Sequence, residues 1–231
     1  MGNSNKFIIS DLSENIFLIR MKEKAKSIDG TFFISLSEYL RKTIKWVDLI
    51  PAEESIAVKY NSLGMSSNEV KNILLRQLKK FNYSDEYQEK SLLHIPVCYC
   101  AEFGLDIEDI VTKYSHSHQE VADLHSSITY KVKMIGFTPG FAYLGDLPDE
   151  LSMPRLTKPR VNLLPGSVGI SGNRTGVYTL GGPGGWRIIG RTPKSLFDPN
   201  KKNPFGISAG MKIKFKAITK RQYENYSNEK M

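Results

Sequence analysis

Residues 136–148 read GFTPGFAYLGDLP, and MPRLTKPR (153–160), LLPGSVGISGNRTGVYTLGGPGGWRIIGRTP (163–193) and LFDP (196–199) follow closely. Between Gly136 and Pro204 lie 12 of the 18 glycines and 9 of the 11 prolines. The residues between them are largely Phe, Tyr, Leu, Val, Ile and Trp, which a flexible linker does not need. Short strands joined by tight turns need both sets. This stretch therefore predicts a folded, β-rich domain whose glycines let backbone approach a ligand closely.

The hydrophobic pattern around this stretch predicts two domains of an α+β protein. From Ile128 to Phe215 apolar residues recur with a period of two and turn signals repeat, which is typical of a closed or nearly closed β-barrel. Before it, the patterns follow in the order βαββαβ, which favours a small ferredoxin-like unit. The expected strands are 16–21, 47–50, 56–60 and 92–99, and the expected helices are 32–44 and one opening at Ser66. The expected domains are 1–90 and 91–220, with a frayed polar tail over 221–231.

Three short motifs predict where helices begin. Ser66 with Glu69, and Ser117 with Glu120, have the spacing of capping boxes. Asp106 is expected to cap a helix over 107–114.

The composition excludes several classes of protein. No apolar run approaches the ~20 residues of a membrane helix, and the first twenty residues do not show the pattern of a secretory signal, so a cytoplasmic protein is expected. The net charge of +8 comes from scattered lysines without a nucleic-acid-binding motif, which argues against nucleic acid. Cys98 and Cys100 are expected to be structural thiols in a reducing compartment, and the histidines do not make a convincing metal site.

Common catalytic motifs do not fit the glycine-rich stretch. GGPGGW offers Trp186 and Arg187 where a phosphate loop needs Lys and Ser or Thr. Ser171 is followed by Asn173 where a nucleophile elbow needs glycine. His125, just before the barrel, is a candidate general acid or base, although a structural hydrogen-bonding role fits equally.

Arginines gather in the same region with few acidic residues nearby. A guanidinium grips a carboxylate or phosphate through two parallel hydrogen bonds, so an anion site is one interpretation and solvated or ion-paired arginines are the other. Phe137 and Trp186 are either core residues or pocket walls. The arginines are Arg155, Arg160, Arg174, Arg187 and Arg191.

Several strings at this order and spacing resemble one family of carboxyltransferase domains of the C/D type. It includes allophanate hydrolase subunit 1, the B-type subunit of 5-oxoprolinase (PxpB) and the kinase inhibitor KipI. The strings are LHSSITY, GFTPGFAYLG, the paired Pro-Arg sites, GSVGI, TGVY, PGGWRIIGRTP and LFDP. The resemblance implies a small α+β domain followed by a cyclophilin-like β-barrel. The sequence departs from the family pattern at Cys100, Ala101 and Leu105, where Gly, Gly and Pro are usual. A changed substrate or a lost activity is therefore a further interpretation.

The resemblance also implies a function and a set of site residues. It implies a component of an ATP-dependent 5-oxoprolinase that opens 5-oxoproline to glutamate. This component needs its paired C-type subunit, which is like allophanate hydrolase subunit 2, and the A-type subunit. ATP, with Mg²⁺, would belong to the complex, and biotin is not expected because no biotin-carrier motif occurs. The other functions considered are inhibition of a sensor histidine kinase and a carboxyltransferase-type role. The implied catalytic residues are His125, Arg155 and Arg160; the implied substrate-binding residues are Phe137, Pro139, Gly140, Phe141, Arg174, Thr175, Gly176, Tyr178, Pro183, Gly184, Gly185 and Trp186.

Overall fold

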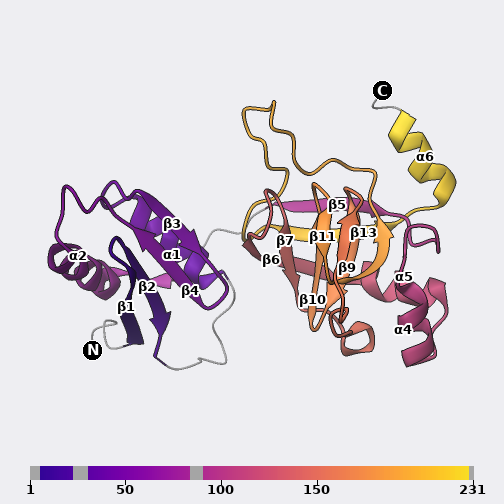
Figure 1. The fold of residues 1–231 in the computed structure, drawn as a ribbon, viewed down its shortest axis with the longest axis horizontal. Helices are drawn as coiled ribbons and strands as arrows, with labels where there is room; N and C mark the ends of the chain where they lie inside the picture. The colour runs from indigo at the N-terminus through magenta and orange to yellow at the C-terminus, as the bar shows by residue number, and fades with distance from the viewer. Residues whose placement is uncertain (1–5, 23–30, 84–90, 229–231) are drawn as a thin grey trace. The chain divides into compact units, whose positions relative to one another are not determined.

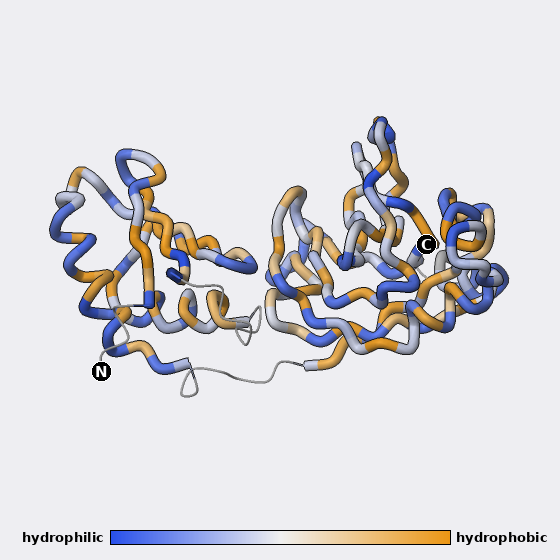
Figure 2. The backbone as a smooth tube through the Cα atoms, turned by 90° about the horizontal axis from the view of Figure 1, so that it is seen from below, coloured by the Kyte–Doolittle hydropathy of each residue, from blue (hydrophilic) through white to orange (hydrophobic). Residues whose placement is uncertain are grey.

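A computed structural model describes residues 6–22, 31–83 and 91–228 of the chain. The chain divides into two compact units, Met1–Glu89 and Lys90–Met231. In Figure 1 the first unit runs from indigo to purple and the second from magenta to yellow. Each unit has its own hydrophobic core, and in Figure 2 hydrophobic residues, in orange, recur along the strands of both.

The described residues of the first unit form a four-stranded antiparallel sheet with two helices. The strand order is β1-β2-β4-β3. Its strands are β1 (Phe7–Ser13), β2 (Ile16–Met21), β3 (Asp48–Pro51) and β4 (Ser55–Lys59), and its helices are α1 (Phe32–Arg41) and α2 (Ser67–Lys80). Helix α2 begins at the predicted capping box, because the Ser66 hydroxyl accepts the backbone N–H of Glu69 and the Glu69 carboxylate accepts the N–H of Ser66.

The ferredoxin-like arrangement expected for this unit is not confirmed. Among the described residues of this unit the order is ββαββα, because β1 supplies a strand that the sequence pattern did not predict. The segment expected to be the last strand of this sheet is β5 (Leu92–Val97), and it pairs in parallel with β13 (Lys212–Ala217) in the second unit. Such a pairing joins residues more than a hundred positions apart, so local periodicity cannot reveal it.

The second unit contains a strongly curled seven-stranded sheet, with the order β12-β9-β10-β7-β6-β13-β5, and a two-stranded ribbon of β8 and β11. The remaining strands are β6 (Thr129–Ile135), β7 (Ala142–Gly145), β8 (Arg160–Leu163), β9 (Ser167–Ser171), β10 (Arg174–Tyr178), β11 (Gly182–Gly184) and β12 (Arg187–Arg191).

The sheet curls into a half-barrel whose two edges meet at one point. Cys98, directly after β5, forms an antiparallel bridge with Arg191 at the end of β12. Its N–H donates to the Arg191 carbonyl at 2.9 Å, and the N–H of Arg191 donates back at 3.0 Å. Gly190 permits this approach, since a Cβ there would lie 2.7 Å from the Cys98 carbonyl oxygen. Among the residues that the structure describes, this one bridge, rather than a longer strand pairing, joins the edges of the curled sheet. The cyclophilin-like character of the predicted barrel stays a prediction.

Helices α4 (Ile107–Tyr114) and α5 (His118–Ser127) pack against one another in the second unit (Figure 1). Helix α5 begins at the predicted Ser117–Glu120 capping box. A short 3₁₀ turn, η2 (Asp149–Leu151), contacts both helices. No helix within the described ranges is long and apolar enough to cross a bilayer.

The expectation of a frayed polar tail over 221–231 is wrong over residues 221–228, which lie in helix α6 (Lys220–Asn228). Tyr223 is buried, and its ring centroid lies 4.4 Å from that of Phe103. Two tyrosines, Tyr223 and Tyr226, give only a weak periodic pattern in this polar sequence, but the buried ring of Tyr223 anchors the helix.

Candidate functional site

His125 lies in the core of the second unit. It is completely buried near the end of α5, and its ring stacks on Phe215 with a centroid distance of 4.5 Å. Its Nδ1 is 2.7 Å from the Tyr99 hydroxyl and its Nε2 is 2.8 Å from the Thr175 hydroxyl. Both ring nitrogens therefore have protein partners.

The neighbouring hydrogen bonds determine how these groups share their protons. Thr175 donates to the carbonyl of Gly169 at 3.1 Å, so its oxygen accepts from the imidazole Nε2–H. Nδ1 then accepts from the Tyr99 hydroxyl. Burial lowers the pKa of His125 to about 3, because an imidazolium ion would be desolvated there. These contacts fit the structural hydrogen-bonding role that the sequence also allowed for His125, and proton transfer by His125 stays a prediction.

Strand β10 separates His125 from most of the other predicted residues. Successive side chains of a strand point to opposite faces of its sheet. Thr175 and Val177 point toward the core around His125, whereas Tyr178 belongs to a second buried group. A Cβ on Gly176 would lie 3.1 Å from both Phe141 and Trp186 on that second side. The predicted site residues are therefore divided between two faces.

The second face carries an aromatic cluster, which we define as Phe141, Tyr143, Tyr178 and Trp186. The ring of Phe141 lies edge-on to Tyr143, Tyr178 and Trp186, with centroids 4.8, 5.0 and 5.4 Å away. Phe141, Tyr178 and Trp186 are buried, so Trp186 is a core residue rather than an open pocket wall. Tyr143 was not among the predicted residues, although its alternation with Ala142 and Leu144 in FAYLG places it on this face.

Glycines make room for these rings. A Cβ on Gly184 would lie 2.6 Å from the Tyr178 hydroxyl, and one on Gly176 would lie 2.8 Å from the Ala142 carbonyl oxygen. Gly169, which the sequence analysis did not single out, would meet Trp186 at 3.1 Å. Gly185 differs, because the nearest atom to its Cβ would be 3.6 Å away on Pro159. Pro183 is exposed on β11.

The GFTPGF turn holds an exposed ring beside the cluster. Phe137 has a φ of 72°, which is unusual for a residue with a side chain, and its side chain is 62% exposed. Its ring packs edge-on to Phe141 at 5.6 Å. Gly140 has a φ of 77°, and the Pro139 carbonyl accepts a hydrogen bond from Thr179. The turn thus leaves Phe137 at the accessible border of the aromatic cluster.

The two predicted anion-binding arginines have different surroundings. Arg160 makes a two-pronged ion pair with Asp106, at 2.7 and 2.8 Å. Arg155 is exposed, and neither a hydrogen bond nor an ion pair joins its guanidinium to any described residue. Burial raises the pKa of Tyr143 and Tyr178, and the charge of Arg155 opposes this rise. Arg155 therefore lies within electrostatic reach of the cluster's two phenols and is available to an anion.

Asp106 corrects the helix cap expected from the sequence. It precedes α4, but its carboxylate makes no capping hydrogen bond. The carboxylate accepts from Arg160 and from the backbone N–H of Ile188 at 2.7 Å. Asp106 is only 5% exposed, so its negative charge requires these partners.

The other three arginines of the turn-rich region also have acidic or carbonyl partners, although few acidic residues lie near them in the sequence. Arg174 pairs with Asp146 at 3.1 Å, and Arg187 pairs with Asp109. Arg191 donates to the carbonyl of Pro165 at 2.9 Å. Folding brings these aspartates from other segments, so local sequence did not show the pairing.

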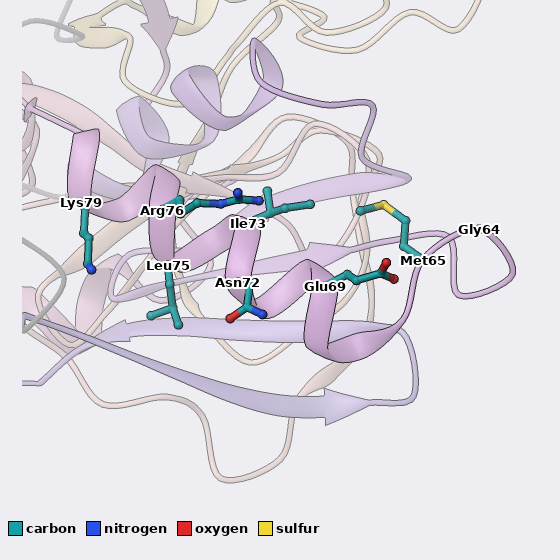
Figure 3. A pocket seen from close by; sticks show the side chains of 8 residues that line it. All are labelled: Gly64, Met65, Glu69, Asn72, Ile73, Leu75, Arg76 and Lys79. Carbon is teal, nitrogen blue, oxygen red and sulfur yellow. The ribbon is translucent and has the colours of Figure 1, made fainter.

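A separate groove runs along α2 in the first unit, with a volume of about 670 Å³. Figure 3 shows its lining, in which Glu69, Arg76 and Lys79 accompany apolar side chains. None of the predicted site residues belongs to this unit. In the described ranges, no three His, Cys, Asp or Glu side chains are grouped to hold a metal ion.

The curled sheet with its aromatic face is a sheet of the carboxyltransferase type, and a solved structure of TTHA0988 has the same fold. That structure matches with a TM-score of 0.76 and 27% identity, covering 91% of this chain and 40% of its own. This chain thus spans about two fifths of TTHA0988's length. The family of the carboxyltransferase domain, subdomains C and D, matches residues 7–207. The chain belongs to this family.

Two curated relatives are similar over different lengths. The B subunit of 5-oxoprolinase from Bacillus subtilis (strain 168) is 33% identical over 237 residues, which cover 97% of this chain and 98% of that protein. The B subunit of 5-oxoprolinase from Escherichia coli O157:H7 is 44% identical over 127 residues, which cover 55% of this chain and 58% of that protein.

Proposed function

We propose that this chain is the B-type subunit of an ATP-dependent 5-oxoprolinase, which opens the lactam of 5-oxoproline to give glutamate. The observation that carries the proposal is the similarity to the Bacillus subtilis protein, the B subunit of its 5-oxoprolinase, over 98% of that protein's length. The match includes both units, so the similarity is not confined to one of them.

The second part of the proposal is that this chain binds substrate and needs the C-type and A-type subunits for the reaction. A buried His125 with an imidazole pKa near 3 is a poor proton carrier at neutral pH. GGPGGW lacks the lysine of a phosphate loop. ATP and Mg²⁺ would supply activation of the substrate's lactam carbonyl within the complex, and we assign them no residue of this chain.

Arg155 is the residue of this chain that we propose to hold the substrate carboxylate. Arg160 is held by Asp106 and serves the fold, whereas the guanidinium of Arg155 is exposed and within electrostatic reach of Tyr143 and Tyr178. The exposed ring of Phe137, which packs on Phe141, would cover the apolar side of a small lactam ring and keep water from it. The guanidinium would orient the substrate through two parallel hydrogen bonds.

Reconstitution tests this function directly. The chain is combined with its C-type and A-type subunits, and glutamate formation from 5-oxoproline is measured with and without ATP. We expect formation that requires ATP and all three proteins. A fully assembled complex that forms no glutamate would show that the proposed function is wrong.

The Arg155→Gln variant tests the carboxylate site within an active complex. We expect the KM for 5-oxoproline to rise about 30-fold, since one charge-assisted hydrogen-bonded pair is lost. Arg76→Gln, at an exposed arginine of α2 in the other unit, is the matched control and should leave KM unchanged. An unaltered KM in Arg155→Gln would remove Arg155 from the site while leaving the function intact.

Kinase inhibition and a carboxyltransferase reaction remain the alternatives from sequence. The full-length relative favours the oxoprolinase over both.

A further inference from the structure

The two cysteines lie at the point where the edges of the curled sheet meet. Cys98 forms the backbone bridge to Arg191. Tyr99, between the cysteines, points into the core, where its hydroxyl meets His125. The two thiols therefore leave the backbone on the opposite side, away from the His125 network.

The local backbone brings these two thiols together. The two cysteines are two residues apart, and both the backbone N–H and the thiol of Cys100 act on the pKa of the Cys98 thiol, the N–H lowering it and the thiol raising it. The chain bends at Cys100, because its carbonyl accepts the N–H groups of Phe103 and Gly104 at 2.9 and 2.8 Å. Cys98 is 1% exposed, whereas Cys100 is half-buried. An outside reagent therefore meets Cys100 first.

The residues directly after Cys100 hold helix α6. Glu102 forms an ion pair with Lys220, and the ring of Phe103 packs on Tyr223. The guanidinium of Arg191 lies over the rings of Phe103 and Tyr223, 5.9 and 6.0 Å from their centroids. The segment that follows the thiols, the meeting point of the sheet edges and α6 thus share one set of contacts.

We propose that Cys98 and Cys100 form a reversible dithiol–disulfide modification site, and that closing the disulfide loosens helix α6. The oxidant is a low-molecular-weight disulfide. The Cys100 thiolate attacks one sulfur of the oxidant and releases one thiol, which leaves a mixed disulfide on Cys100. The Cys98 thiol then loses its proton as its sulfur attacks the Cys100 sulfur. The bond between Cys100 and the small group breaks, the released small thiolate takes up a proton, and the internal disulfide is closed. Two protein thiols are oxidised, and one small disulfide is reduced to two thiols.

The environment fits this order of steps and its reversibility. Burial raises the pKa of Cys98 to about 11, so this thiol keeps its proton and reacts second. A disulfide across a single intervening residue departs from relaxed geometry, and strained disulfides are the ones that are easily reduced. Closing it would tighten the bend at Cys100 and move Glu102 and Phe103, which carry the α6 contacts.

The experiment treats the native full-length chain with glutathione disulfide and follows its intact mass. We expect loss of two hydrogens with no retained glutathione, and recovery with dithiothreitol. Cys98→Ser should instead keep one glutathione on Cys100, and Cys100→Ser should stay unmodified under the same conditions. A wild-type chain that retains glutathione as Cys98→Ser does would overturn the internal disulfide.

Hydrogen exchange on the same samples tests the connection to α6. We expect amides around Tyr223 to exchange at least ~10-fold faster in the oxidised chain. The displaced Glu102 and Phe103 would no longer hold α6, so local opening of this helix would cost less free energy. The Cys98→Ser adduct controls for modification without ring closure. Unchanged exchange in a fully oxidised wild-type chain would overturn the effect on α6.

Discussion

The two faces of β10 carry neighbouring residues with different surroundings. On one face, Thr175 completes a buried hydrogen-bond network with His125 and Tyr99, and we call this side of the strand the sealed face. On the other, Tyr178 belongs to the aromatic cluster and Gly176 leaves room for its rings. The exposed Phe137 borders this cluster, and the exposed Arg155 lies within electrostatic reach of its phenols. A conspicuous titratable residue can thus stabilise the fold, while ligand binding falls to the face that remains accessible. Adjacent residues of the TGVY string (175–178) therefore need not share a function.

The largest expected effect comes from removing the imidazole of the sealed face. His125→Ala should lower the free energy of unfolding by about 4 kcal/mol, because it leaves a cavity and deprives the Tyr99 and Thr175 hydroxyls of their partner. Urea unfolding measures this loss. His125→Gln, whose amide can both donate and accept, should lose less. A stable His125→Ala chain would show that the network does not hold the fold.

The two arginines near the aromatic cluster should separate stability from binding. Arg160→Gln should destabilise the chain by about 3 kcal/mol, because the buried Asp106 keeps its charge and loses its cation. Arg155→Gln, at an exposed residue, should change stability by less than ~0.5 kcal/mol. Thermal unfolding of both variants checks this difference. Equal losses would mean that Arg155 also serves the fold and would weaken its proposed role.

The sequence predicted features that depend on residues close together in the chain, and it missed those that depend on distant residues. Both capping boxes are confirmed because they join groups three residues apart. Asp106 had the pattern of a helix cap, but Arg160, 54 residues away, took its carboxylate. The parallel pairing of β5 with β13 needs a contact that no local pattern encodes.

For the candidate site too, the sequence predicted the local features and missed those that depend on distant residues. The turn-rich strings supplied the aromatic residues, since their alternation places them on one face. The carboxylates that pair Arg160, Arg174 and Arg187 come from distant segments, so the ion-paired interpretation holds for these three and Arg155 stays the candidate for an anion. Burial of His125 is likewise a property of the assembled core.

Glycine packing offers a smaller test of the aromatic face. Gly184→Ala should cost about 2 kcal/mol, because the new methyl group would overlap the Tyr178 hydroxyl and Leu163. Gly185→Ala, one residue later, has 3.6 Å to its nearest neighbour and should cost less than ~0.5 kcal/mol. Urea midpoints of the pair measure this difference. Similar midpoints would show that the cluster has room that the contacts do not indicate.

The smallest effect concerns protonation on the sealed face. The pKa of His125 is lowered from an ordinary 6.5 to about 3 in the folded chain by burial. The unfolded chain therefore binds the extra proton first as the pH falls, and stability decreases with falling pH below 6.5. Between pH 7 and 5.5 this residue should remove about 1.3 kcal/mol.

Comparing the wild type with His125→Gln isolates this pH effect. Every other titratable group is common to both chains, so their unfolding free energies should converge by about 1.3 kcal/mol as the pH falls from 7 to 5.5. Urea unfolding at a series of pH values measures the convergence. Parallel pH profiles would mean that the imidazole is protonated inside the folded chain. His125 would then exchange protons after all, and the division between a structural face and a binding face would fail at its most buried residue.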